Sequence, residues 1–199
     1  MNLKRNTQSR RLAVVLIGAA VVAGCSSPQP VSTPAPAPAP VVQGPPPRPV
    51  PTATAAAIVR DMSGKQVGSL QFAETYAGVL ITGSMGNLGL GGHAIHIHET
   101  GKCEAPYTTA GAHFNPTNRH HGYKNPTGPH LGDLPNLDLP AAGVQKFEML
   151  LPGVTLKGPQ GLLDADGASI VVHASRDDYV GDPSGNSGGR IACGVIVQR

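Results

Sequence analysis

The chain has 199 residues, with 26 glycines, 20 prolines, no tryptophan and 14% charged residues. This length suits one domain with a real core but not two large ones, and a composition rich in glycine and proline favours short strands and many loops. The formal net charge of +3 comes from the first 24 residues, which hold four basic residues and no acid; without them it is −1. The basic isoelectric point therefore gives no support to nucleic-acid binding.

Residues 1–24 have the pattern of a secretory signal peptide. A basic segment precedes an apolar run from Leu12 to Val22, which is too short to span a bilayer comfortably as a mature helix. Val22-Ala23-Gly24-Cys25 resembles the lipobox of bacterial lipoproteins, which implies cleavage before Cys25 and acylation of that residue. We therefore expect an exported protein of the cell envelope or periplasm, lipid-anchored to a membrane. An ordinary leader with a chance cysteine is the alternative.

Residues 25–51 are expected to form a disordered linker that begins at the lipidated cysteine. Eleven of the 20 prolines lie between residues 28 and 51. Such a segment cannot form a packed core and favours extended polyproline II, with a reach on the order of 70 Å. Its simplest role is a spacer between membrane and domain, and a proline motif that binds a partner is the alternative.

The folded domain is expected to occupy residues 52–199. Eight short apolar or alternating runs, separated by turns, predict strands. They are Ala53–Arg60, Gln66–Glu74, Gly78–Met85, Gly92–His98, Val144–Leu150, Val154–Leu156, Ser169–Ala174 and Ile191–Val197. The stretch from 99 to 139 is long, polar and irregular, which is unusual in a compact domain unless it is functional. The pattern predicts an all-β antiparallel sandwich or barrel.

Histidines are crowded into one part of this domain. The segment from Gly91 to Glu99 contains three of them, two as His96-Ile97-His98. On a strand, residues two apart point to the same face, so the two imidazoles would project together and suit Zn, Cu, Fe or Ni. Seven of the eight histidines lie between residues 93 and 130, and His130-Leu131-Gly132-Asp133 adds a carboxylate. These are ligands of the type that bind zinc.

Together these segments resemble the bacterial copper/zinc superoxide dismutases, in the order typical of that family. The matching segments are His93–Glu99, Gly101–Cys103, Ala110–Pro116, His121-Gly122, His130–Leu134, His173 and Gly189–Val195. Each is weak alone, but the set is highly specific and covers nearly all of residues 53–199. The resemblance implies an eight-stranded antiparallel Greek-key β-barrel or sandwich, immunoglobulin-like, with long metal-binding and active-site loops.

The resemblance also implies one copper and one zinc per subunit. The residues that match the copper ligands are His96, His98, His113 and His173. Those that match the zinc ligands are His113, His121, His130 and Asp133. One imidazole, that of His113, is shared because the family bridges the two metals with it.

Further matches concern residues around the metals. Asp177 matches an acid that connects a copper-ligand histidine to a zinc-ligand histidine, here His96 and His121. His121 is preferred to His120 as the ligand because the family pattern has histidine followed by glycine, which leaves His120 as a surface residue. His93 resembles a structural histidine that links backbone segments.

Arg190 matches the family's active-site arginine, a cation that would attract and orient a small anion. Cys103 and Cys193 match the family disulfide, which would tie the long loop to the last strand and hold Arg190 in position. The loop between Asp177 and Arg190 is short and carries no lysine. Steering of the substrate by loop cations other than Arg190 is therefore not expected.

The implied activity is the dismutation of superoxide, 2 O₂⁻ + 2 H⁺ → O₂ + H₂O₂, which protects the cell envelope. Copper would alternate between Cu(II) and Cu(I), Arg190 and His113 would be the catalytic residues, and zinc would be structural. By analogy with the family, His113 would also supply a proton. Bacterial members include monomers and homodimers, and the sequence leaves both open.

Three other functions are compatible with parts of the sequence. A non-catalytic periplasmic copper/zinc-binding protein would share the ligands but has no use for Arg190. A zinc hydrolase needs an open zinc position, whereas four protein ligands close the predicted one. A structural wall or membrane protein is suggested by the proline-rich tether, which concerns location rather than chemistry.

Overall fold

The structure is a computed structural model that describes residues 53–158 and 160–199. The predicted signal peptide, the predicted acylation site Cys25 and the predicted linker lie outside these residues. Within the described part of the chain, no helix is long and apolar enough to cross a membrane. The described residues form ten strands and one short 3₁₀ helix, η1 (Thr108–Ala110), so the predicted all-β class is confirmed.

Most strands lie where they were predicted, but the predicted strands Gly92–His98 and Ile191–Val197 are each divided into two shorter ones. Their bounds are β1 (Thr54–Asp61), β2 (Gln66–Thr75), β3 (Gly78–Gly86), β4 (Gly91–His93), β5 (Ile95–His98), β6 (Leu137–Leu139), β7 (Val144–Pro152), β8 (Ser169–His173), β9 (Arg190–Val195) and β10 (Val197–Gln198). The prediction of a strand at Val154–Leu156 is wrong, because this backbone bonds instead to its own loop and to the Glu74 carboxylate. The three-residue strand β6 was not predicted.

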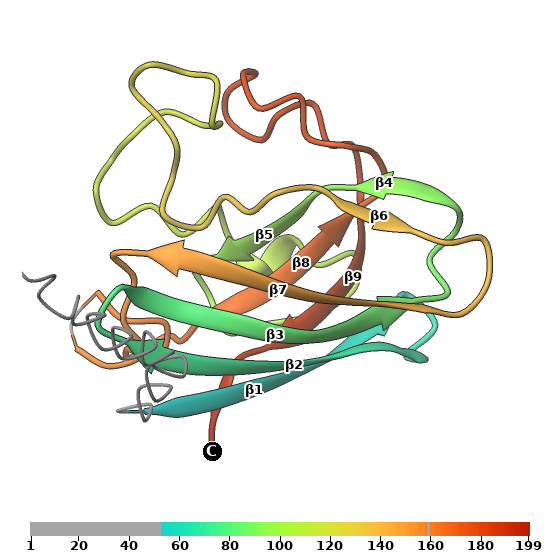
Figure 1. Ribbon diagram of the computed structural model, residues 1–199, viewed down its shortest axis with the longest axis horizontal. Helices are drawn as coiled ribbons and strands as arrows, with labels where there is room; N and C mark the ends of the chain where they lie inside the picture. Colours follow the sequence, from blue (N-terminus) through green and yellow to red (C-terminus); the bar gives the residue numbers. More distant parts are fainter. Residues whose placement is uncertain (1–52, 159) are drawn as a thin grey trace, which may run out of the picture. The chain divides into compact units, whose positions relative to one another are not determined.

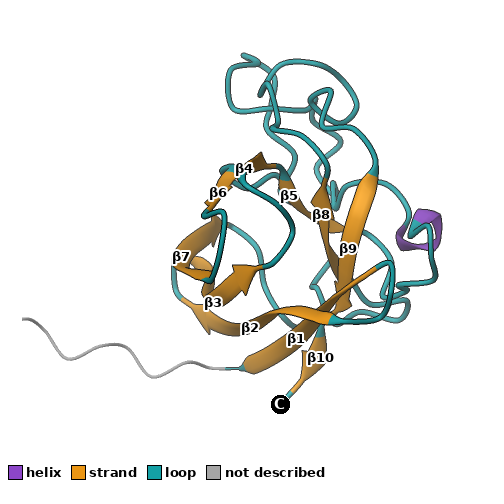
Figure 2. Ribbon diagram, turned by 90° about the vertical axis from the view of Figure 1, so that its right-hand side faces the viewer, coloured by secondary structure: helices purple, strands orange, loops and turns teal. Residues whose placement is uncertain are grey.

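Eight strands form one antiparallel sheet in the order β5-β8-β9-β1-β2-β3-β7, with β10 paired to β1. Consecutive strands β1, β2 and β3 are neighbours, and β9 returns by a long connection to lie beside β1, which gives the strand order of a Greek key. Figure 2 shows the sheet curling, with the short β4–β6 pair between its two edge strands β7 and β5. The predicted eight-stranded antiparallel architecture is therefore confirmed.

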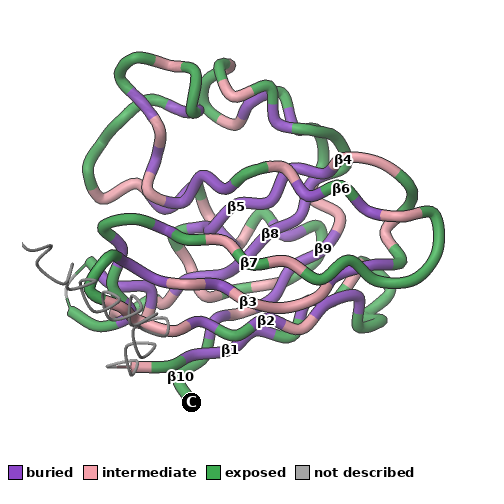
Figure 3. Tube along the Cα trace, viewed as in Figure 1, coloured by how far each residue is buried: buried purple, intermediate pink, exposed green. Residues whose placement is uncertain are grey.

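The core fills the inside of this curled sheet. Alternate residues of each strand face inward, as Leu70 and Phe72 do on β2 and Ile170 and Val172 on β8, and all four are at most 1% exposed. Fully burying a large apolar side chain contributes about 1.5–3 kcal/mol. Figure 3 shows the buried residues along β5 and β8 and exposed ones on the outer strand β7. The strands β5 and β8, which carry the clustered histidines, are thus buried along their whole length.

Two long loops leave the sheet on the same side. The loop after η1 runs to β6, and the loop from 174 to 189 joins β8 to β9; they lie next to each other above β5 and β8 (Figure 1). The segment between β5 and η1 is tied to β9 by a disulfide between Cys103 and Cys193, whose Cα atoms are 5.6 Å apart. The predicted disulfide is confirmed. In the chain-entropy model, closing a loop of this size with a disulfide adds about 4–5 kcal/mol to the free energy of unfolding.

Candidate metal centre

Strand β5 directs two histidines into one buried cluster. Because side chains alternate along a strand, His96 and His98 point to the same face, and both are 0% exposed. An isolated bridge pairs His98 with His113 and another pairs His96 with Asp133, so the irregular loop is held against the strand by backbone bonds. His173, the last residue of β8, completes the group from the neighbouring strand.

One set of ligand atoms converges where copper is expected. Atoms of His96, His98, His113 and His173 all lie within 4.8 Å of one another. Among the described residues, the buried nitrogens without a hydrogen-bond partner include Nδ1 of His96 and Nε2 of the other three. An unpaired buried polar atom costs about 1–3 kcal/mol, and four imidazole nitrogens are donors that copper accepts. The cluster therefore fits a metal ion.

The outer nitrogens of two of these rings, His98 and His173, face backbone carbonyls. His98 Nδ1 donates to the Gly111 carbonyl at 3.0 Å, and His173 Nδ1 lies 3.3 Å from the Gly188 carbonyl and 3.1 Å from Ser187 Oγ. A carbonyl can only accept, so these nitrogens carry the proton and Nε2 keeps its lone pair for the cluster. Burial lowers the pKa of His98 to about 2 and that of His173 to about 3, which favours the neutral rings that a metal needs.

A second set of ligand atoms surrounds Asp133. Its Oδ1 lies 3.0 Å from His113 Nδ1, 3.1 Å from His121 Nδ1 and 3.3 Å from His130 Nδ1, and the last is 3.4 Å from His113 Nδ1. Four ligands at zinc distances of about 2.0–2.1 Å would be separated by roughly 3.3 Å in a tetrahedron. The other oxygen, Oδ2, accepts from the backbone N–H groups of Gly122 and His130. The donor set and its spacing fit zinc.

His96 also comes within 4.8 Å of His113, His121 and Asp133, so it could be grouped with either set. We place it in the first set, because its Nε2 is occupied by Asp177 and its Nδ1 is the unpaired atom. His113 is the one ring with an atom in each set: Nε2 is unpaired, whereas Nδ1 faces Asp133. Burial lowers the pKa of His113 to about 4, although Asp133 partly opposes this effect.

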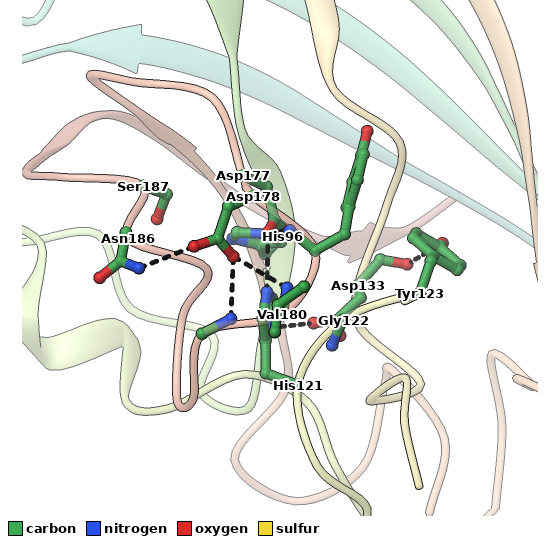
Figure 4. A network of polar contacts seen from close by, with 12 residues as sticks. His96, His121, Gly122, Tyr123, Asp133, Asp177, Asp178, Val180, Asn186 and Ser187 are labelled. Atoms are coloured by element: carbon green, nitrogen blue, oxygen red, sulfur yellow. Dashed lines mark hydrogen bonds and ion pairs between the residues drawn. The ribbon is translucent and has the colours of Figure 1, made fainter. Parts of the chain in front are cut away.

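Asp177 connects the two sets of ligand atoms by contacting one histidine of each. Its two oxygens lie 2.9 Å from His96 Nε2 and 2.9 Å from His121 Nε2, and Oδ1 also accepts from the Tyr179 N–H (Figure 4). Burial alone would raise its pKa, but the hydrogen bonds from both histidines lower it. Burial would likewise lower the pKa of His121, but hydrogen bonds to Asp133 and Asp177 raise it to about 9.

Arg190 stands at the edge of the cluster. Its two terminal nitrogens donate to the carbonyls of Tyr107 at 2.6 Å and Gly111 at 2.7 Å. It lines a cavity of about 370 Å³ together with His113 and His173, and it is the only cation that lines it within the described part of the chain. Burial lowers the pKa of this guanidinium, which remains charged at neutral pH because arginine titrates above 12.

Two histidines lie outside both sets. His120 is exposed, and its Nδ1 lies 2.5 Å from Asp182 Oδ2. The Nδ1 of His93 donates to the backbone carbonyl of His173 at 2.8 Å, so it links β4 to the end of β8. Tyr107 and Gly185 carry no sequence signal that would have identified them as part of the site. The first presents a carbonyl to Arg190, and the second leaves space for Asp177.

Comparisons with known proteins agree with this arrangement. A sequence profile of the family described as copper/zinc superoxide dismutase (SODC) matches residues 66–196. Superoxide dismutase [Cu-Zn] 1 of Aquifex aeolicus (strain VF5) is 43% identical over 144 residues, 70% of this chain and 85% of the relative. Superoxide dismutase-like protein YojM of Bacillus subtilis (strain 168) is 37% identical over 193 residues, 94% of this chain and 96% of the relative.

A crystal structure of a SOD-like protein from Bacillus subtilis has a TM-score of 0.67 at 40% identity, and the match covers 70% of this chain and 96% of that one. The chain therefore belongs to the copper/zinc superoxide dismutase family. The resemblance stated from the sequence is confirmed, and copper and zinc are the metals of its family.

Replacing Gly185 should weaken the zinc site. Gly185 has φ +64°, and a Cβ there would overlap the Asp177 carboxylate and lie 2.6 Å from His121 Nε2. We expect Gly185→Ala to lower zinc affinity by about 10–100-fold, the usual effect of disturbing groups that orient metal ligands. Chelator competition measures this, with Gly189→Ala as the matched control because nothing lies within 4 Å of its added Cβ. Equal affinities of the two variants would contradict the prediction.

Proposed function

We propose that the chain dismutates superoxide to O₂ and H₂O₂ with one copper and one zinc in this centre. Copper is assigned to His96, His98, His113 and His173, and zinc to His113, His121, His130 and Asp133. The observation that carries the proposal is the position of the His113 ring, which contributes one nitrogen to each set of ligand atoms while Arg190 lies beside it on the same cavity. The family assignment supports the same chemistry.

The protein's own residues have separable roles in this proposal. Bound copper would supply the one-electron redox change that zinc lacks. Arg190 attracts the anion into the cavity and donates charge-assisted hydrogen bonds to it. When its Nε2 is not a copper ligand, His113 would take a proton from solvent at that nitrogen and pass it to the peroxide product, while Asp133 keeps the opposite edge of the ring in place. Asp177 fixes the orientation of His96 and His121.

A non-catalytic copper/zinc-binding protein is the second candidate. The observation that favours it is the similarity to YojM over 94% of this chain, since that protein is described as superoxide dismutase-like. Against it stands Arg190, whose hydrogen bonds go to the carbonyls of Tyr107 and Gly111 and which would have no role in a metal store.

The two candidates are separated by superoxide decay catalysed by residues 52–199. We expect protein loaded with Cu and Zn to reach the near-diffusion-limited rates for which this enzyme class is known, about 10⁸–10⁹ M⁻¹s⁻¹. The same protein loaded with Zn alone should be inactive, because zinc does not change oxidation state. A slow rate despite folded protein with one copper and one zinc would favour the metal-binding protein instead.

Arg190 should control the encounter with the anion. We expect Arg190→Ala to lower the second-order rate constant by about 10–100-fold and to remove most of its dependence on ionic strength, because electrostatic attraction is lost. Metal content, checked by elemental analysis, should stay at one copper and one zinc. Arg60→Ala is the matched control, since Arg60 bonds to the Gly64 carbonyl away from the centre. An unchanged rate in Arg190→Ala would count against this role.

We propose further that the mature protein is a lipoprotein of the cell envelope, with residues 1–24 removed, Cys25 acylated, residues 25–51 as spacer and residues 52–199 as the enzyme. The lipobox-like segment Val22–Cys25 supports this organisation. We expect Cys25→Ser to move the protein from the membrane to the soluble fraction of a bacterial host, and to abolish incorporation of labelled palmitate. Retention of Cys25→Ser in the membrane, without incorporated palmitate, would refute the anchor.

Sedimentation of residues 52–199 would decide between monomer and homodimer.

A further inference from the structure

The carboxylate of Asp182, outside the metal cluster, accepts hydrogen bonds from the loop that carries His121. Asp182 lies in the loop between β8 and β9, and its Oδ1 accepts the backbone N–H of His121 at 2.6 Å. Its Oδ2 lies 2.5 Å from Nδ1 of His120, the preceding residue. Both oxygens of one side chain are therefore used on two consecutive residues of a different loop. The second contact gives His120 a defined partner, although neither Asp182 nor His120 belongs to a ligand set.

His121 is consequently held from two sides by the same loop. Asp177 contacts its ring at Nε2 at 2.9 Å, and Asp182 contacts its backbone at 2.6 Å. The remaining ring nitrogen, Nδ1, faces Asp133 at 3.1 Å. A ring contact alone leaves the ring free to move along with its backbone. A second contact at the backbone N–H removes that freedom and fixes where Nδ1 lies.

The neighbouring acid on the loop behaves differently. Asp178 accepts the backbone N–H groups of Val180 and Gly181 through Oδ1 and the side-chain amide of Asn186 through Oδ2 (Figure 4). All of its contacts stay within its own loop. Asp178 therefore orders the loop internally, whereas Asp182 joins the loop to the segment that carries His121. The two acids offer a matched comparison.

We propose that Asp182 is a positioning residue for the zinc site, acting through the backbone of His121, and that His120 strengthens its hold. This inference rests on the proposed function, because it assumes that His121 binds zinc. The side chains of Asp182 and His120 are 43% and 63% exposed, and exposed ion pairs contribute little to folding stability. The effect should therefore appear in retention of zinc rather than in folding. Groups that orient metal ligands typically change metal affinity 10–100-fold.

The experiment measures zinc release from the copper- and zinc-loaded protein into a chromophoric chelator. We expect Asp182→Ala to release zinc about tenfold faster than wild type, with copper content unchanged. Asp182→Asn should recover much of the loss, because its amide oxygen can still accept the His121 N–H. His120→Gln should have a smaller effect than Asp182→Ala. The d–d absorption of Co(II) placed in the zinc site should broaden in Asp182→Ala only, since it reports ligand geometry.

Asp178→Ala is the control, and it should release zinc within about threefold of wild type. Equal release from wild type and Asp182→Ala would overturn the inference. So would equally fast release from Asp178→Ala and Asp182→Ala, because that result would mean general loosening of the loop. If the wild-type protein holds no zinc, both the proposed function and the role of Asp182 are refuted. If wild type holds both metals but does not dismutate superoxide, the proposed function fails while the zinc-release comparison still decides the role of Asp182.

Discussion

The carboxylate of Asp177, placed between His96 and His121, is the contact on which both halves of the centre depend. It is fully buried and lies 2.9 Å from each ring. A buried charge is tolerated only when hydrogen bonds satisfy it, and here both imidazoles and the Tyr179 N–H do so. The same contact orients one histidine of each ligand set. Gly185 is needed beside it, because any side chain there would occupy the space of the carboxylate.

A second shared atom couples Arg190, the proposed anion-binding cation, to the first set of candidate metal ligands. The Gly111 carbonyl accepts from His98 Nδ1 and from Arg190. The other nitrogen of Arg190 bonds to the carbonyl of Tyr107, whose ring is buried and whose hydroxyl donates to the backbone carbonyl of Arg60 on β1. The guanidinium is thus positioned by main-chain atoms rather than by other side chains. Its place relative to the copper-side histidines is set by the backbone of the segment that the disulfide ties to β9.

Much of the architecture could be predicted, because strand periodicity is a local property. Alternation in His96-Ile97-His98 correctly placed two rings on one face of β5. The strand predicted at Val154–Leu156 is wrong because burial there is achieved without a strand partner. Strand β6 was missed because a strand of three residues, with prolines at 135 and 140, is too short to show a periodic signal. The contacts of Asp182 and Gly185 could not be foreseen, since they depend on how two loops distant in sequence meet.

The arrangement of the loop acids explains how a loop without lysine can still serve an anionic substrate. Three aspartates lie close in sequence, at 177, 178 and 182, and like charges at the cavity would repel superoxide. Each, however, is committed to hydrogen bonds, with histidines or with N–H groups of the two loops, and none of the three lines the cavity of Arg190. Because interactions between exposed charges are screened over about 8–10 Å, the nearest cation dominates the final approach. Among the side chains that line the cavity, attraction of the anion therefore rests on one guanidinium, which adds to the charge that bound metals would supply, and the negative charge beside it serves to orient ligands.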